Sequence, residues 1–165
     1  MNLSYWEEKH YFEDNDLVVI GAGIVGLSTA IAAKTLRPDL KVLVLERSIV
    51  PSGASTKNAG FACFGSVTEL ISDSVNMKYE DQIALLKMRW DGLKLLQSNV
   101  TPEDMSYRSR GGVEVLELDD VSQITALDNI NKYNEMVSDA IGLKDCFSIV
   151  DQHLSDSFHS KAIYN

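Results

Sequence analysis

A glycine-rich turn between an apolar run and a helix-forming run constrains this chain more than any other feature. Leu17–Ile20 is a continuous run of apolar, strand-forming residues, which predicts a strand buried on both faces of a parallel sheet. The glycines that follow are spaced G-x-G-x-x-G, and residues 24–36 favour a helix. The order of strand, glycine turn and helix predicts a site for a dinucleotide.

Each glycine of the turn has a distinct expected role. Gly21 allows the tight turn, Gly23 lets the backbone approach a pyrophosphate, and Gly26 lets the helix pack closely on the strand. The N-terminus of the helix offers unpaired N–H groups and a partial positive charge to the phosphates. The predicted binding turn consists of Gly21, Ala22, Gly23, Ile24, Val25 and Gly26.

A second apolar strand is expected at residues 41–46, which completes a βαβ unit of about thirty residues with a parallel sheet. Glu46 closes this strand, where a dinucleotide fold places an acid on the ribose hydroxyls. A solvated glutamate at a strand end is the alternative. An acid at this position also disfavours the 2′-phosphate of NADP.

Residues 51–66 are predicted to form a loop of small residues with many hydrogen-bond donors. Such a loop lets a large ligand lie against the backbone, and an ordinary flexible surface loop is the alternative. Phe61 and Phe64 favour burial of part of it.

Composition limits the partners and the compartment. The 165 residues carry a formal charge of −9, which disfavours binding to nucleic acid. No apolar run reaches the ~20 residues needed to span a bilayer, and residues 1–14 lack the features of a signal peptide. Cys63 and Cys146 show no metal-ligand spacing and are expected to be reduced thiols, so a cytoplasmic protein without a metal site is predicted.

The first and middle parts of the chain carry several helix signals. Residues 1–15 are expected to be an aromatic-rich arm that packs on the domain surface, or else a disordered lead-in. Ser66 and Glu69 have the spacing of a capping box that opens a short helix. A longer helix is predicted over residues 79–98, and 101–103 resemble the start of another.

The last part is predicted to mix strands and helix. Residues 105–110 and 113–118 are expected to be extended and joined by a hairpin turn or bulge at 111–112. One helix is predicted over 121–141, ended by Gly142, and a strand over 146–150.

The strand, the glycine turn, Glu46-Arg47 and the loop 53–60 together resemble the FAD-dependent amine and amino-acid oxidoreductases. This is the superfamily of D-amino-acid oxidase, glycine oxidase and sarcosine oxidase. The segment Ser4–Glu7 looks most like the γ-glutamylputrescine oxidase branch. The resemblance implies an α/β fold: a Rossmann-like FAD-binding βαβ unit followed by the start of a mixed α+β substrate domain, incomplete in this chain.

The resemblance also implies roles for individual residues. The glycine turn would hold the FAD pyrophosphate, Glu46 would bind the adenosine ribose, and Arg47 would border the adenine. In the loop, Ser55 and Thr56 would reach the pyrophosphate or the ribityl chain. The remaining loop residues would line the site, the last four along the path to the isoalloxazine ring: Gly53, Ala54, Lys57, Asn58, Ala59 and Gly60.

Lys57 stands where relatives often have arginine, so it keeps the charge but loses the bidentate fork. It is a candidate for stabilising the reduced flavin, unless its side chain is exposed. The sequence singles out no catalytic residue, since the three histidines lie in polar contexts.

The implied reaction is oxidation of the C–N bond of a small amine or amino acid, with hydride transfer to flavin N5 and hydrolysis of the imine. The expected organisation is an arm at 1–15, the first half of the FAD-binding domain at 16–70, and the opening of the substrate domain at 71–165. The chain is expected to be an N-terminal portion, completed by a C-terminal half or a partner subunit. An NAD-dependent dehydrogenase and a non-catalytic truncated or split FAD-binding piece are the alternatives.

Overall fold

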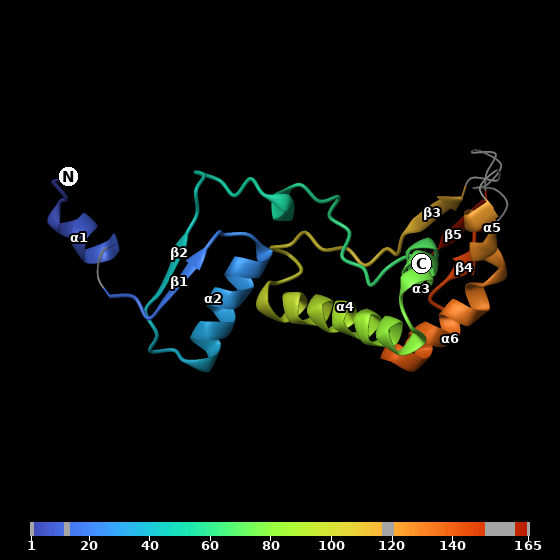
Figure 1. Ribbon diagram of the computed structural model, residues 1–165. Helices are drawn as coiled ribbons and strands as arrows, with labels where there is room; N and C mark the ends of the chain where they lie inside the picture. Colours follow the sequence, from blue (N-terminus) through green and yellow to red (C-terminus); the bar gives the residue numbers. More distant parts are fainter. Residues whose placement is uncertain (1, 12–13, 117–120, 151–160, 165) are drawn as a thin grey trace. The chain divides into compact units, whose positions relative to one another are not determined.

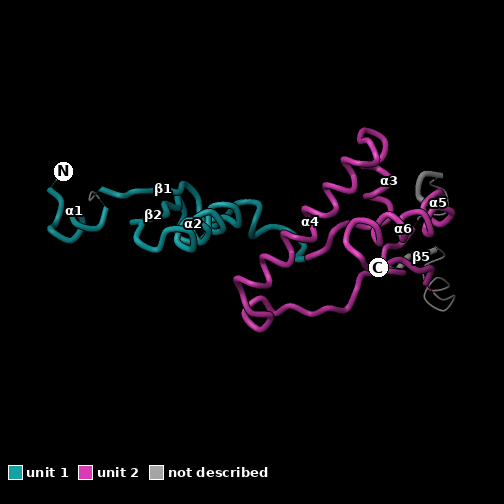
Figure 2. Tube along the Cα trace, turned by 90° about the horizontal axis from the view of Figure 1, so that it is seen from below, with its two compact units in different colours: residues 1–61 teal, residues 62–165 magenta. Residues whose placement is uncertain are grey.

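The computed structural model describes the chain except residues 1, 12–13, 117–120, 151–160 and 165. The described chain divides into unit 1, residues 1–61, and unit 2, residues 62–165 (Figure 2). Each unit has its own elements and is described by itself.

Unit 1 contains a parallel βαβ arrangement (Figure 1). Its β1 and β2 strands pair in parallel, with Leu17 opposite Val42 and Ile20 opposite Leu45. The predicted strand, helix and strand are confirmed in order and type, as is the α/β fold class. The elements of unit 1 are α1 (Tyr5–Tyr11), β1 (Leu17–Ile20), α2 (Ile24–Leu36), β2 (Val42–Leu45) and the 3₁₀ turn η1 (Ala54–Thr56).

The predicted burial of β1 on both faces is wrong for the described chain. Val19 is buried, but Val18 is 47% exposed and Ile20 is 87% exposed. The sheet of unit 1 has two strands, and α2 is the helix that contacts both of them. Among the described residues of unit 1, no element covers Val18 and Ile20, although their apolar character is that of a covered strand.

The N-terminal arm forms the short helix α1. Ser4 and Glu7 bond reciprocally at its start, with the Ser4 N–H donating to Glu7 at 2.8 Å and the Glu7 N–H to Ser4 Oγ at 3.2 Å. No residue of α1 is buried, and Tyr5 and Trp6 pack edge to face on each other. The expected packing of the arm on the domain surface is therefore not seen.

Unit 2 packs four helices with a small antiparallel sheet of order β3-β5-β4. Its elements are α3 (Val67–Asn76), α4 (Tyr79–Asn99), β3 (Val113–Leu116), α5 (Val121–Asp128), α6 (Ile130–Ile141), β4 (Ser148–Ile149) and β5 (Lys161–Tyr164). The core is shared by all four helices and β3. Its fully buried large side chains are Val67, Leu70, Leu86, Leu116, Tyr133, Met136, Val137 and Phe147.

Several helix predictions in unit 2 are confirmed. The Ser66 hydroxyl accepts the Glu69 N–H and the Glu69 carboxylate accepts the Ser66 N–H, which is a complete capping box at the start of α3. The long helix begins at Tyr79 as predicted and ends one residue later, at Asn99. Gly142 ends α6 in the left-handed conformation, with φ of +75°.

Other predictions in unit 2 are wrong. β3 pairs with β5, about fifty residues further along the chain, and 105–110 form a turn and coil rather than the partner strand of a hairpin. No helix follows Thr101, where the chain makes turns. The strand predicted over 146–150 is only Ser148–Ile149.

The helix predicted over 121–141 is two helices that meet at Asn129. The Asn129 side chain donates to the Thr125 carbonyl oxygen at 2.8 Å. This bond occupies a carbonyl of the preceding turn, and asparagine is a residue whose side chain competes with the helical backbone in this way. Residue 129 leaves the helical conformation, with ψ of 5°.

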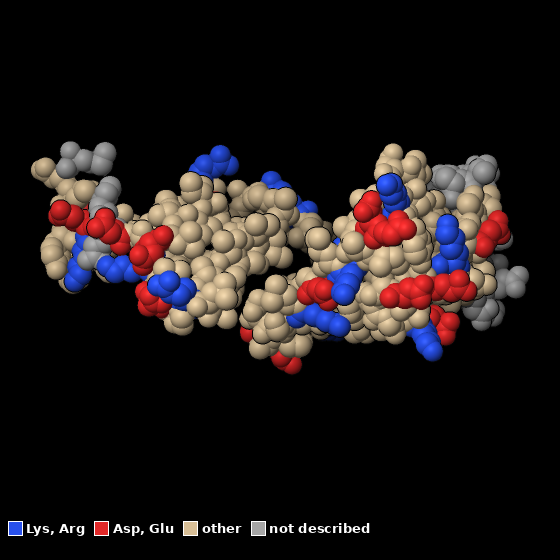
Figure 3. All heavy atoms as spheres, turned by 60° about the horizontal axis from the view of Figure 1, so that its bottom comes forward, with Lys and Arg blue, Asp and Glu red and all other residues tan. Residues whose placement is uncertain are grey.

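The described surface is charged but mixed. On the face drawn in Figure 3, acidic and basic side chains are interspersed on unit 2 and gather into no large basic patch. No helix among the described residues has the length and apolar character to cross a membrane.

Candidate cofactor site

The glycine turn in unit 1 brings the end of β1 back over the start of α2. Gly21 has φ of +97°, and its N–H donates to the Leu45 carbonyl at 2.7 Å. A Cβ at position 26 would lie 2.0 Å from the Gly21 carbonyl oxygen, inside the range that any side chain tolerates. A residue without a side chain is therefore required where α2 crosses the turn.

The start of α2 presents several backbone N–H groups. Gly23 is the N-cap and supplies no side chain to cap the helix. The N–H of Leu27 is the one that bonds back to the Gly23 carbonyl, at 2.9 Å, so the N–H groups of Val25 and Gly26 precede the first intrahelical bond. A helix start that leaves two N–H groups free is suited to an anion.

Glu46 joins the end of β2 to the glycine turn. Its Oε2 accepts the Ala22 N–H at 2.9 Å and its Oε1 accepts the Ser48 N–H at 3.1 Å. The Ala22 and Ser48 bonds lower the pKa of the Glu46 carboxyl below its ordinary value. An ionised carboxylate thus stands beside the turn, in a form that accepts hydrogen bonds from hydroxyl groups.

Ser55 reaches the start of α2 from the loop that follows β2. Its Oγ accepts the Ile24 N–H at 2.9 Å, across 31 positions of sequence. A Cβ at position 23 would lie 3.0 Å from this hydroxyl oxygen, so the loop lies directly against the glycine turn. The predicted turn, acid and loop serine therefore converge within unit 1.

The remaining loop residues divide into two groups. The side chains of Thr56 and Asn58 form hydrogen bonds within the loop. The Thr56 hydroxyl donates to the carbonyls of Pro51 and Gly53 at 3.0 and 3.2 Å. The Asn58 amide bonds to Ser55 and Gly60. The other predicted residues are exposed: Arg47, Gly53, Ala54, Lys57, Ala59 and Gly60.

Two expectations about the loop are not supported. Lys57 is exposed, so the condition for its role beside the reduced flavin is not met in the described structure. Phe61 is 81% exposed, whereas Phe64 packs on the core of unit 2 and contacts Trp90 edge to face.

Ser48 is a site residue that the sequence reasoning missed. Its N–H holds one oxygen of Glu46, and its hydroxyl lies 3.4 Å from that of Ser52. The donor is a backbone N–H that most residues at position 48 would supply, so no motif of the sequence signals this contact.

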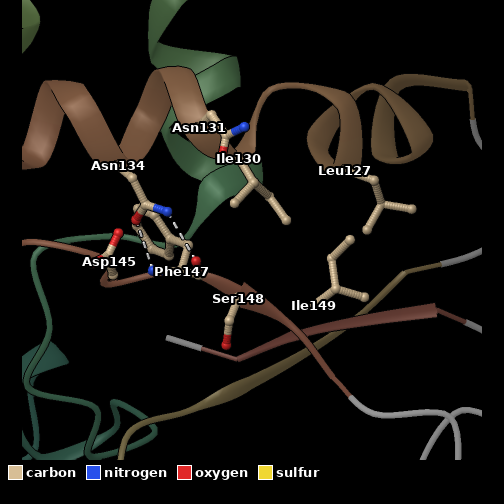
Figure 4. A pocket seen from close by; sticks show the side chains of 8 residues that line it. All are labelled: Leu127, Ile130, Asn131, Asn134, Asp145, Phe147, Ser148 and Ile149. Carbon is tan, nitrogen blue, oxygen red and sulfur yellow. Dashed lines mark hydrogen bonds between the residues drawn. The ribbon is translucent and has the colours of Figure 1, made fainter.

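Unit 2 contains a separate cavity of about 470 Å³ beside α5, α6 and β4 (Figure 4). Asn134 spans part of its wall: its amide donates to the Phe147 carbonyl at 2.9 Å and accepts the Phe147 N–H at 2.8 Å. None of the predicted cofactor residues lines it. The lining residues are Leu127, Ile130, Asn131, Asn134, Asp145, Phe147, Ser148 and Ile149. Among the residues with described positions, no cluster of His, Cys, Asp or Glu is arranged to hold a metal ion.

Comparison with known proteins places this site in context. The family described as FAD dependent oxidoreductase (DAO) matches residues 16–156. The thiamine thiazole synthase of Ajellomyces capsulatus is 42% identical over 55 residues, which is 33% of this chain and 16% of that protein. Those of Uromyces fabae and Schizosaccharomyces pombe are 34% and 30% identical over 84 and 87 residues, or 45% and 50% of this chain.

The match covers 25% and 26% of the lengths of these last two proteins. The chain thus spans about a quarter or less of the curated relatives that it matches. No solved structure is significantly similar.

Proposed function

This chain belongs to the FAD-dependent oxidoreductase family, and from that membership we propose that unit 1 binds FAD and that the protein oxidises the C–N bond of an amine or amino acid. The finer assignment, to the branch of D-amino-acid, glycine and sarcosine oxidases, is supported by the motifs at 16–60. A still finer likeness to γ-glutamylputrescine oxidase is supported by Ser4–Glu7 alone.

The observation that carries the proposal is the convergence of three groups on the start of α2. A diphosphate requires hydrogen-bond donors such as the free N–H groups of Val25 and Gly26 and the hydroxyl of Ser55. A ribose requires an acceptor such as the ionised carboxylate of Glu46. The absence of a Cβ at Gly23 keeps this surface open to a phosphate group.

Roles follow for the residues of unit 1. The N–H groups at the helix start and the Ser55 O–H donate to the diphosphate, and the Glu46 carboxylate accepts hydrogen bonds from the ribose. Thr56 is not assigned to the ligand, because its hydroxyl already donates within the loop. FAD, when bound, supplies the acceptor for the hydride that leaves the substrate.

Unit 2 is assigned to the opening of the substrate domain. Its mixed helices and antiparallel sheet follow the nucleotide-binding unit directly along the chain, in the order the family resemblance implies. The similarity to the thiamine thiazole synthases of Uromyces fabae and Schizosaccharomyces pombe covers 45% and 50% of this chain.

Titration with FAD tests the proposal. We expect the protein to quench flavin fluorescence in a saturable way and to be stabilised against thermal unfolding by FAD, with no stabilisation by NAD. Stabilisation by NAD alone would favour the dehydrogenase alternative, and a protein that takes up neither dinucleotide would overturn the assignment. Bleaching of the bound flavin by an amine or amino acid without oxygen would then identify the substrate class.

A further inference from the structure

We propose that Asn58 is a positioning residue of the cofactor site, which holds Ser55 at the start of α2 rather than contacting the cofactor. The inference rests on the proposed binding of FAD in unit 1. It assigns Asn58 a role different from the one implied by family resemblance, in which this residue lines the path to the flavin ring.

Both ends of the Asn58 amide are engaged within the loop. Its Nδ2 donates to the Ser55 carbonyl at 2.7 Å, and its Oδ1 accepts the Gly60 N–H at 2.7 Å. Gly60 has φ of +79°, in the left-handed region that favours glycine. The Asn58 amide oxygen and one of its N–H groups are therefore already hydrogen-bonded within the loop in the absence of a ligand.

Ser55 is held at two points, one on each side of the residue. The Asn58 amide donates to the Ser55 carbonyl, and the Ser55 hydroxyl accepts the Ile24 N–H at 2.9 Å. The hydroxyl proton of Ser55 has no acceptor among the described contacts, which leaves it to donate to a phosphate oxygen. The position of that donor therefore depends on both bonds.

The rest of the loop is fixed by a few local bonds, among them those from the Thr56 hydroxyl to the carbonyls of Pro51 and Gly53. The turn η1 has two backbone bonds of its own, from Thr56 to Gly53 at 3.2 Å and from Lys57 to Ala54 at 3.1 Å. Residues 56–60 are exposed, so packing does not restrain them. Side-chain to backbone bonds of asparagine are the usual means by which such a loop keeps its shape.

The geometry at the glycine turn makes the placement of Ser55 critical. Its hydroxyl oxygen already lies 2.9 Å from the Ile24 nitrogen, an ordinary hydrogen-bond distance that leaves little room to move closer to the turn. Movement away from the turn lengthens the bond from Ile24, and hydrogen bonds weaken steeply once their distance and angle leave a narrow range.

A double-mutant cycle tests whether Asn58 acts through Ser55. FAD and ADP binding would be measured by fluorescence titration and by competition for Asn58→Ala, Ser55→Ala and the double variant. We expect each single substitution to weaken both ligands roughly tenfold, and the double variant to be no weaker than Ser55→Ala. Asn58→Asp, which keeps the acceptor for Gly60 but loses the donor to Ser55, should behave like Asn58→Ala.

Ser52→Ala is the matched control, since Ser52 lies in the same loop and its hydroxyl faces Ser48 at 3.4 Å; it should leave both affinities unchanged. Two results would overturn the inference: losses that multiply in the double variant, or weaker FAD binding with ADP binding intact, which indicates a direct flavin contact. Wild-type protein that binds neither FAD nor ADP would instead refute the proposed function.

Discussion

Glu46, at the end of β2, is linked to the glycine turn by its carboxylate, which accepts the Ala22 N–H. We predict that Glu46→Ala weakens FAD binding roughly tenfold or more, because the ribose loses a charged acceptor and the Ala22 N–H loses its partner. Fluorescence titration measures this loss. Glu80→Ala, which removes an exposed acid in the first turn of α4, serves as the control and should bind FAD as the wild type does.

The same carboxylate makes a defined contribution to the pH dependence of stability. Bonds from Ala22 and Ser48 lower the Glu46 pKa in the folded protein, so the folded state favours the ionised form. The stabilisation is therefore complete above the unfolded pKa and is lost as the pH falls through the folded one. We expect the stability difference between wild type and Glu46→Gln to be constant near neutral pH and to shrink below about pH 4.5, which denaturant unfolding at several pH values would show. A difference that grows toward low pH would contradict this assignment of the shift.

Gly26 is required by the close approach of backbone to backbone. A methyl group at this position would lie 2.0 Å from the Gly21 carbonyl oxygen, and neither chain segment can yield without moving α2 on β1. We predict that Gly26→Ala destabilises unit 1 by about 3 kcal/mol, measured by hydrogen exchange at the β1 and β2 amides. Gly53→Ala is the control in the same unit, because a Cβ there meets nothing within 4 Å; equal effects of the two substitutions would exclude steric contact as the cause.

At the scale of elements, the success of sequence reasoning followed the range of the interactions that form each element. The bounds of β1 and α2 were predicted because their signals are local: an apolar run, a glycine turn and a helix-forming run. The capping box at Ser66 was predicted for the same reason. The partner of β3 was not, since β5 lies about fifty residues away and a Gly-Gly pair indicates a turn whether or not the flanking segments pair.

The candidate site divides in the same way. The glycines and Glu46 were predicted from motif spacing, and the structure brings Glu46 to the turn through Ala22. The choice of Ser55 over Thr56 as the residue that reaches α2 depends on how a three-residue 3₁₀ turn orients successive side chains. Loop composition does not carry that information.

Asn134 joins α6 to the segment that enters β4. Its side chain bonds to both the N–H and the carbonyl of Phe147, a residue that is 2% exposed. We predict that Asn134→Ala destabilises unit 2 by about 2 kcal/mol, because two buried backbone groups lose their partner. Denaturant unfolding measures the change.

Asn131→Ala is the matched control for this substitution, as Asn131 lines the same cavity from the same helix but is exposed (Figure 4). Its effect should stay within about 0.5 kcal/mol. Similar losses for both asparagines would mean that the effect comes from helix propensity and not from the bonds to Phe147.

At the scale of the whole molecule, the two units differ in how well their apolar residues are covered. Unit 2 holds the contiguous core, with eight large side chains under 2% exposure, whereas unit 1 has Val19 as its one buried apolar residue among those described. Burial of apolar surface is the main source of stability, so unit 1 is expected to open more readily than unit 2. The proposed binding of FAD would then have a large effect on how readily unit 1 opens.

The last prediction follows from that difference. All residues assigned to the cofactor lie in unit 1, which ends at residue 61. FAD at a hundred times its dissociation constant should stabilise the form that binds it by about 2.7 kcal/mol, which corresponds to about a hundredfold slower exchange of amides exposed by opening of that unit. We therefore expect hydrogen exchange to slow at the amides of β1, α2 and β2 and to remain unchanged at the core amides of α4 and α6. NAD at the same concentration is the control. Equal slowing in both units would show that they open together, and slowing confined to unit 2 would place the ligand away from the glycine turn.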